Sequence, residues 1–149
     1  VDEINGSSLE KGYIYSVGCN SNGNSGKVGT LEITNSIDPV TEAVIPLSEV
    51  VIVTDCNVTF AQGTLVQNAR IITTSTDVKS FTAPSGLQIG GYDGTCETDE
   101  DAAQLITQGG MSFAADFSAY GSQLIAQSDI TFAATPTKSK PIHQKSNTQ

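Results

Sequence analysis

The densest group of side chains that could do chemistry is an acidic stretch between residues 93 and 101. It holds five carboxylates, Asp93, Glu97, Asp99, Glu100 and Asp101. Carboxylate oxygens are ligands that Ca²⁺ prefers, so this loop is a candidate calcium site with Asp93, Glu97, Asp99 and Asp101 as ligands. The spacing matches neither an EF-hand nor a glycine-rich calcium repeat, and a solvated acidic loop is the alternative. We expect no other cofactor.

The remaining titratable residues do not form a recognisable catalytic group. The single histidine, His143, lies close to the C-terminus, which removes Ser-His-Asp and Cys-His arrangements from the main body of the chain. Asp77 and Asp129 fall at equivalent positions of an internal repeat, where a carboxylate pair would permit glycoside hydrolysis. Aspartate is also a routine turn residue. We therefore predict that the chain is not an enzyme.

Three cysteines, Cys19, Cys56 and Cys96, allow one disulfide and one remaining thiol. We expect Cys56 to pair with Cys96 if the acidic loop folds back, with Cys19 free or bonded to another molecule. The chain begins with Val1 and not with Met, as expected of a processed form or a fragment. Its composition is rich in Asn, Thr, Ser and Gly and poor in Lys, like that of secreted bacterial surface proteins. We expect a secreted, extracellular or cell-surface location.

Most of the candidate carboxylates and cysteines lie in or beside an internal repeat, which is clearest in the second half of the chain. Residues 103–115 and 122–134 are identical at seven of thirteen positions, nineteen residues apart. Two looser copies precede them, so that the four copies start at residues 51, 70, 104 and 123. Self-similarity at a fixed period is the signature of a repeat architecture.

Each copy has the pattern of two short strands joined by a bend, for example Leu105-Ile106 followed by Met111-Ser-Phe113. A single copy cannot bury its own apolar face, whereas copies stacked about 4.8 Å apart can. We predict an all-β fold, a short parallel β-solenoid of about four coils, with an antiparallel sandwich as the alternative. The predicted core consists of Phe60, Phe81, Phe113 and Phe132 in one interior column, together with Leu105, Ile106, Leu124 and Ile125.

The segments outside the repeats differ from them in composition. The apolar runs Tyr13–Val17 and Val28–Ile33 flank a tract rich in Asn, Gly and Ser, which predicts a β-hairpin. The C-terminal residues contain two prolines, three lysines and no period, which predicts a flexible polar tail. The predicted organisation is 1–50 for the N-terminal strands and cap, 51–134 for the solenoid repeats with an insertion at 90–102, and 135–149 for the tail.

Charge and hydropathy narrow the class of partner. The net charge is −9, from seven basic and sixteen acidic residues. Nucleic-acid binding needs clustered cations, and the repeats contain no such cluster, so we expect no nucleic-acid partner. No apolar run approaches the roughly 20 residues of a membrane span, so we also expect no membrane span in this chain.

Three segments carry a resemblance to a known family. They are the Ala-Pro-Ser-Gly-Leu-Gln-Ile-Gly run at 83–90, the Cys-containing acidic loop, and the paired copies after Ala103. Together they resemble the C-terminal region of tight-adherence (Tad) pilus-assembly proteins of the TadG type, over about residues 56–134. The similarity is most specific at Tyr120-Gly-Ser-Gln-Leu-Ile-Ala126. It implies an envelope or extracellular role in building or decorating a surface fibre, without catalysis.

The two ends of such a stack expose unpaired strand edges, which accept further strands. We therefore expect the chain to assemble with itself or with other pilus or fibre proteins. The predicted function is that of an extracellular structural subunit of a pilus or fibre. The first alternative is a surface adhesin or glycan-binding module that uses Tyr92, Tyr120 and the acidic loop. The second alternative is an intracellular polymer resembling the bactofilins. The predicted assembly residues are Tyr13, Ile14, Tyr15 and Val17 at one end, and Ile130 and Phe132 at the other.

Overall fold

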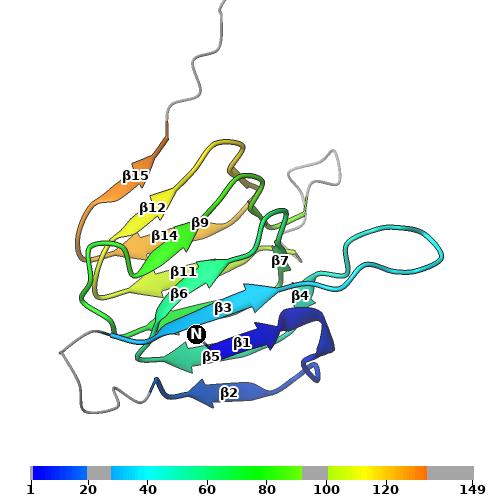
Figure 1. The fold of residues 1–149 in the computed structure, drawn as a ribbon, viewed down its shortest axis with the longest axis horizontal. Helices are drawn as coiled ribbons and strands as arrows, with labels where there is room; N and C mark the ends of the chain where they lie inside the picture. The colour runs from blue at the N-terminus through cyan, green and yellow to red at the C-terminus, as the bar shows by residue number, and fades with distance from the viewer. Residues whose placement is uncertain (1, 20–27, 92–100, 134–149) are drawn as a thin grey trace, which may run out of the picture.

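The computed structural model describes residues 2–19, 28–91 and 101–133, and these residues form a stack of parallel strands (Figure 1). Apart from one short 3-10 helix, η1 (Gly6–Ser8), all their regular elements are β-strands. The strands form three sheets, and every pairing between named strands is parallel. The prediction of an all-β parallel solenoid is confirmed.

The three sheets have six, five and four strands in the described part of the chain. Sheet A has the order β1 (Asp2–Asn5), β3 (Thr30–Thr34), β6 (Asn57–Phe60), β9 (Phe81–Ala83), β12 (Met111–Phe113) and β15 (Ile130–Phe132). Sheet B has the order β2 (Ile14–Val17), β5 (Val51–Thr54), β8 (Arg70–Thr73), β11 (Gln104–Thr107) and β14 (Gln123–Ala126). Sheet C has the order β4 (Leu47–Ser48), β7 (Leu65–Gln67), β10 (Gln88–Ile89) and β13 (Ser118–Ala119).

One coil of the solenoid passes sheets B, A and C in that order. The coils β5–β6–β7, β8–β9–β10 and β11–β12–β13 are complete, and β14–β15 begins another. Their first strands begin at residues 51, 70, 104 and 123, where the four sequence copies begin. The repeat in the sequence is therefore the coil of the fold.

The predicted N-terminal hairpin is wrong. Strand β2 lies in sheet B and pairs with β5, whereas β3 lies in sheet A between β1 and β6. With β4 these strands form a further complete coil, so the N-terminal residues belong to the stack. The alternating pattern of two half-buried strands is the same in a hairpin and in a coil, which is why the sequence did not distinguish them.

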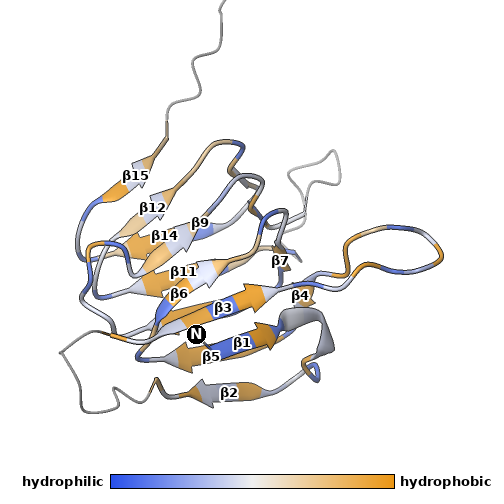
Figure 2. Cartoon of the chain, viewed as in Figure 1, coloured by the Kyte–Doolittle hydropathy of each residue, from blue (hydrophilic) through white to orange (hydrophobic). Residues whose placement is uncertain are grey.

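Apolar residues recur on successive strands of the stack (Figure 2), and those that point inward form rows that run from coil to coil. Phe60, Phe81 and Phe113 are each at most 1% exposed, as predicted. They do not form one column, however, because Phe81 pairs in register with Val58 and Met111. The residue between Phe60 and Phe113 in their own row is an alanine. The rings of Phe60 and Phe81 still stack, with centroids 6.2 Å apart.

Two of the predicted core residues face the outside of sheet B. Leu105 is buried and Leu124 is partly buried, but their neighbours Ile106 and Ile125 lie on the other face, and Ile125 is 47% exposed. Successive side chains of a strand point to opposite faces, so an apolar pair cannot lie wholly inside. Phe132 pairs in register with Phe113 but is 53% exposed, because β15 is the last described strand of sheet A.

Buried threonines fix the corner between sheets B and A. Thr54, Thr73 and Thr107 occupy one inward row of sheet B. Each hydroxyl oxygen accepts a hydrogen bond from the backbone N–H two residues later, at 3.0, 3.1 and 2.9 Å. In the following coil this position is Ala126. The hydroxyls satisfy amides that the bend would otherwise leave without a partner.

We expect Thr73→Val to lower the free energy of unfolding by about 1–3 kcal/mol. The Thr73 hydroxyl accepts from the Ser75 amide and donates to the Cys56 carbonyl at 2.5 Å, and valine does neither. Urea denaturation measures the loss. Thr82→Val, on the outward face of β9, is the matched control and should change stability by only a few tenths of a kcal/mol. Equal losses in the two variants would show that the corner hydroxyls are not structural.

Candidate functional site

Most of the acidic loop lies outside the described residues. This applies to Asp93, Glu97 and Asp99 of the predicted calcium site, and also to Tyr92 and Cys96. Of the predicted calcium ligands the structure describes Asp101, which is exposed and whose main-chain oxygen accepts a hydrogen bond from the Asn68 amide at 3.0 Å. The calcium site stays a prediction.

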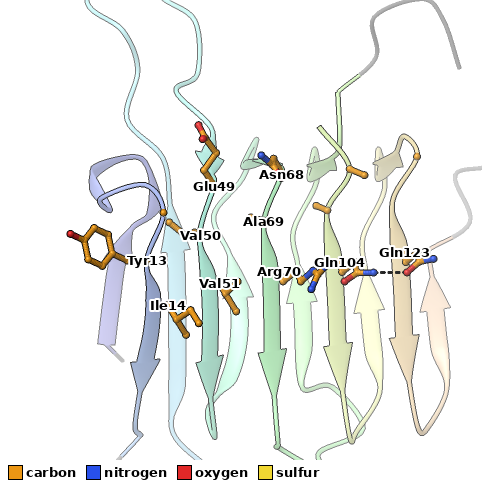
Figure 3. Close-up of a pocket in the computed structure, with 14 residues that line it drawn as sticks. Tyr13, Ile14, Glu49, Val50, Val51, Asn68, Ala69, Arg70, Gln104 and Gln123 are labelled. Atoms are coloured by element: carbon orange, nitrogen blue, oxygen red, sulfur yellow. Dashed lines mark hydrogen bonds between the residues drawn. The ribbon is translucent and has the colours of Figure 1, made fainter. Parts of the chain in front are cut away.

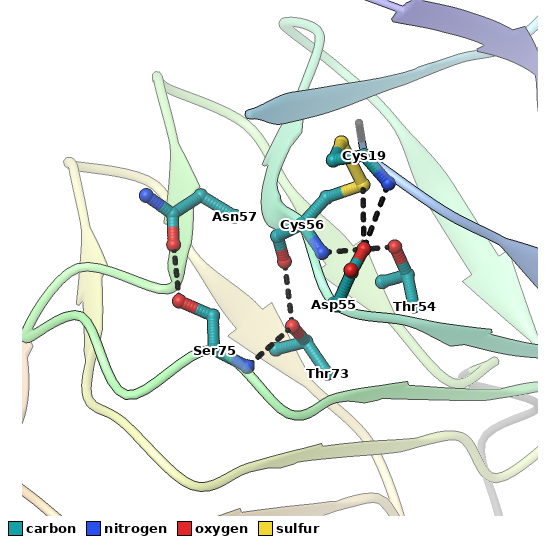
Figure 4. Close-up of a disulfide and its surroundings, with 7 residues drawn as sticks. All are labelled: Cys19, Thr54, Asp55, Cys56, Asn57, Thr73 and Ser75. Carbon is teal, nitrogen blue, oxygen red and sulfur yellow. Dashed lines mark hydrogen bonds between the residues drawn. A yellow bond between two sulfur atoms is a disulfide. The ribbon is translucent and has the colours of Figure 1, made fainter. Parts of the chain in front are cut away.

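The disulfide joins Cys56 to Cys19, so the predicted pairing of Cys56 with Cys96 is wrong (Figure 4). Ile14 of β2 pairs with Val51 of β5, 37 positions later, and the two cysteines are also 37 positions apart. They therefore occupy equivalent places in neighbouring coils, with Cα atoms 5.2 Å apart. That distance is close to the spacing of stacked strands and within the range that a disulfide spans.

Cys19, Asp55 and Cys56 form the one group of potential metal ligands found among the described residues, with ligand atoms within 4.8 Å of one another. Both sulfurs are in the disulfide, so neither is a thiolate, the form in which cysteine binds metal. The Asp55 carboxylate accepts a hydrogen bond from the Cys19 amide at 2.7 Å. The group therefore links the corners of two neighbouring coils, after β2 and after β5.

Asp77 is a turn residue whose side chain stabilises the bend between β8 and β9. Its carboxylate accepts hydrogen bonds from the Lys79 amide at 2.8 Å and from the Asn57 side-chain amide at 3.3 Å. The main-chain oxygens of Asp77 and Asp129 accept from Gly110 and Met111, at 2.9 and 3.0 Å. These contacts join successive coils at one corner. The Asp77 carboxylate has a structural role there, whereas the contact of Asp129 is made by its main chain.

A shallow groove of about 620 Å³ crosses the outer face of sheet B, near the start of its strands (Figure 3). One residue of each strand contributes to a row that lies in register across five coils. The floor beside this row is formed partly by small residues such as Ala69, Ala103 and Gly121. The row consists of Ile14, Val51, Arg70, Gln104 and Gln123.

The polar side chains of the groove are presented to solvent. Gln104 donates its side-chain amide to the carbonyl oxygen of Gln123 at 2.6 Å, which orients both amides along the row. Arg70 is exposed and has no ion pair or side-chain hydrogen bond with the described residues. At one end, Tyr13 is 54% exposed, and Glu49 forms an ion pair with Lys11 at 3.1 Å. The groove thus combines an aromatic ring with a cation and amides.

A second outward row on sheet B is largely apolar. Val53, Ile72, Ile106 and Ile125 are in register on successive strands, one step along from the groove. Each is at least partly exposed. The sequence interpretation assigned two of them to the core, so this surface is found only once the strand register is known.

The two ends of the stack differ in charge. At the N-terminal end of sheet A, Asp2 and Glu3 lie in the edge strand β1, and Asp2 is in register with the buried Leu31. An inward-facing charge on an edge strand opposes the addition of another strand. At the other end, β14 and β15 contain no charged residue, and Phe132 is half exposed.

The predicted assembly residues at the N-terminal end lie in or beside β2. Tyr13 and Ile14 are 54% and 74% exposed. Tyr15 is partly buried, and its hydroxyl accepts from the Glu10 amide and donates to the Glu10 carbonyl at 2.9 and 3.1 Å. Val17 also packs against the core. Because β2 is paired with β5, this segment is an edge of the stack and not an unattached strand.

A loop between β3 and β4 projects from the side of the solenoid (Figure 1). Val40 near its tip is 88% exposed. The backbone N–H groups of Thr41 and Val40 donate to the Asp38 carboxylate and lower its pKa below the ordinary value. The tip is therefore ordered by its own turn chemistry.

A protein-family model described as a domain of unknown function, DUF7867, matches residues 2–139. The chain belongs to this family. No curated protein and no solved structure matches the chain. The DUF7867 match includes every residue of the described solenoid. Within the described residues, no helix has the length and hydrophobicity needed to cross a membrane.

Proposed function

We propose that this DUF7867 chain is an extracellular structural protein, a subunit of a pilus or surface fibre that assembles through the ends of its solenoid. The observation that carries the proposal is the uncharged end formed by β14 and β15, where side chains of the interior rows remain partly exposed. Leu124, Ile130 and Phe132 would be buried by one further layer of strands. Such an end favours association.

Head-to-tail stacking has a defined geometry in this fold. Sheet A is one strand longer than sheet B because β1 precedes β2. Pairing of β1 of one copy with β15 of the next would place Asp2 beside Ile130, a cost that the apolar contact of Ile4 with Phe132 has to offset. In this arrangement sheet B has a gap of one strand between β14 and β2. Both strands that border this gap are uncharged. A strand from a second copy, or from another fibre protein, would complete the layer.

The disulfide supports a location outside the cytoplasm. Disulfides persist in oxidising compartments and are rare where thiols are kept reduced. The bond between Cys19 and Cys56 therefore favours an exported fibre subunit over an intracellular polymer of the bactofilin kind. The resemblance to TadG-type proteins agrees with an envelope role.

We expect Thr131→Lys to reduce self-association measured by light scattering at a series of protein concentrations. Thr131 faces outward in the uncharged edge strand β15, and a lysine on an edge strand opposes further pairing. Thr82→Lys is the matched control, since Thr82 lies in the same outward row on the interior strand β9. It should assemble like the wild type. A wild type that stays monomeric at the highest concentration contradicts the proposal, as does equal inhibition by both variants.

Glycan binding is a second candidate function, and the groove on sheet B favours it. The groove contains an exposed tyrosine, an arginine without an ion pair to the described residues, and two glutamines that lie in the same row as the arginine. It lies on the side of the stack and not at its ends, so glycan binding and assembly are compatible.

A further inference from the structure

We propose that the groove on sheet B binds an extended, uncharged, β-linked polysaccharide. The proposal is independent of fibre assembly, because the ligand would lie across the side of the solenoid. The ligand chain would run perpendicular to the strands, along the row Ile14–Val51–Arg70–Gln104–Gln123 (Figure 3).

The repeat of the surface matches the repeat of such a ligand. Neighbouring strands of a sheet are about 4.8 Å apart, so the five positions of the row extend over about 19 Å. A β-linked glucan ribbon advances by about the same distance with each sugar. Successive sugars would therefore meet successive side chains of the row, which a helical α-linked glucan would not.

The side chains supply the contacts that a sugar ring needs. Arg70 offers planar N–H donors that no acidic side chain of the described residues occupies, and these fit neighbouring hydroxyl groups. The amides of Gln104 and Gln123 are already oriented by their mutual hydrogen bond. Tyr13 adds an exposed ring at the β2 end of the row (Figure 3), and small residues such as Ala103 keep the floor flat.

Other polymers fit this groove less well. An extended peptide would need unpaired main-chain groups, but β5, β8 and β11 are hydrogen-bonded on both sides. Nucleic acids and polyuronates carry a charge on every unit, whereas Arg70 is the one cationic residue among the described residues that line the groove, in a chain of net charge −9. Repulsion therefore favours an uncharged ligand.

The test is isothermal titration calorimetry of the full chain with neutral β-linked hexaoses of glucose, N-acetylglucosamine, xylose and mannose, and with polygalacturonate. We expect at least one neutral hexaose to bind. Arg70→Ala should weaken that binding about tenfold, because one charge-assisted hydrogen-bonding group is lost. Gln123→Ala should weaken it by a smaller factor. Lys79→Ala removes an exposed cation at another corner of the solenoid and should leave the affinity unchanged.

Binding of none of the neutral hexaoses overturns the proposal, as does binding of polygalacturonate alone. The same conclusion follows if Arg70→Ala and Gln123→Ala both bind like the wild type. Both residues are exposed, and circular dichroism checks that the variants remain folded.

Discussion

Replacing Phe113 by alanine is expected to lower the free energy of unfolding by about 3–5 kcal/mol. The side chain is 1% exposed, and its ring contacts those of Phe117 and Phe132 with centroids 4.6 and 5.8 Å apart. The cavity would lie between two layers of the stack, where neighbouring strands are held by in-register pairing and cannot collapse into it. Chemical denaturation measures the change.

The control is the same substitution one layer further on. Phe132 pairs in register with Phe113, but it is 53% exposed. Phe132→Ala removes the same atoms from a position that is half in water, so about 1 kcal/mol is expected. Similar losses at the two positions would mean that Phe113 is not enclosed between coils, and the arrangement of layers would then be wrong.

Removing the disulfide is expected to have an effect of similar size. Cys19 and Cys56 close a loop of 37 residues, and the loss of that constraint on the unfolded chain is worth about 4 kcal/mol. The double variant Cys19→Ser, Cys56→Ser should therefore unfold at a markedly lower denaturant concentration than the wild type. Adding a reductant to the wild type should produce most of the same shift.

The third cysteine provides the comparison for this experiment. Cys96→Ser leaves the bond between Cys19 and Cys56 intact, so its stability and its response to reductant should match those of the wild type. If Cys96→Ser were as unstable as the double variant, Cys96 would belong to the structural disulfide. The pairing seen between the first two complete coils would then be incorrect.

The sequence predicts the fold from Val51 onward well because the copies form two pairs, and the members of each pair follow one another directly. The strands that begin at Gln104 and Gln123 are separated by nineteen residues, and the strands that begin at Val51 and Arg70 have the same spacing. Coils that stack in register need similar side chains at equivalent positions, and the sequence therefore repeats with the length of one coil.

The first complete coil was not recognised because it is much longer than the nineteen-residue repeat. Ile14 and Val51 are 37 positions apart, with a projecting loop and other residues between them. At the equivalent corners, Val17-Gly-Cys19 and Thr54-Asp-Cys56 share only the cysteine, which is too little to mark a coil boundary.

The groove was missed for a different reason. No local sequence pattern marks Arg70, Gln104 or Gln123 as a binding residue. Their alignment in one row is known only from the register of sheet B. The same is true of the outward hydroxyl row on sheet A, which consists of Thr59, Thr82, Ser112 and Thr131. A sequence gives the composition of a surface, whereas its geometry depends on pairing between distant strands.

Electron microscopy of the purified protein tests the proposed assembly most directly. Six layers of sheet A, each about 4.8 Å deep, predict unbranched fibres one solenoid wide that rise by about 29 Å per subunit. Thr131→Lys should give few fibres, and Thr82→Lys should give as many as the wild type. Single particles of monomer size at all concentrations, or fibres with an unrelated rise, would contradict assembly through the ends of the solenoid.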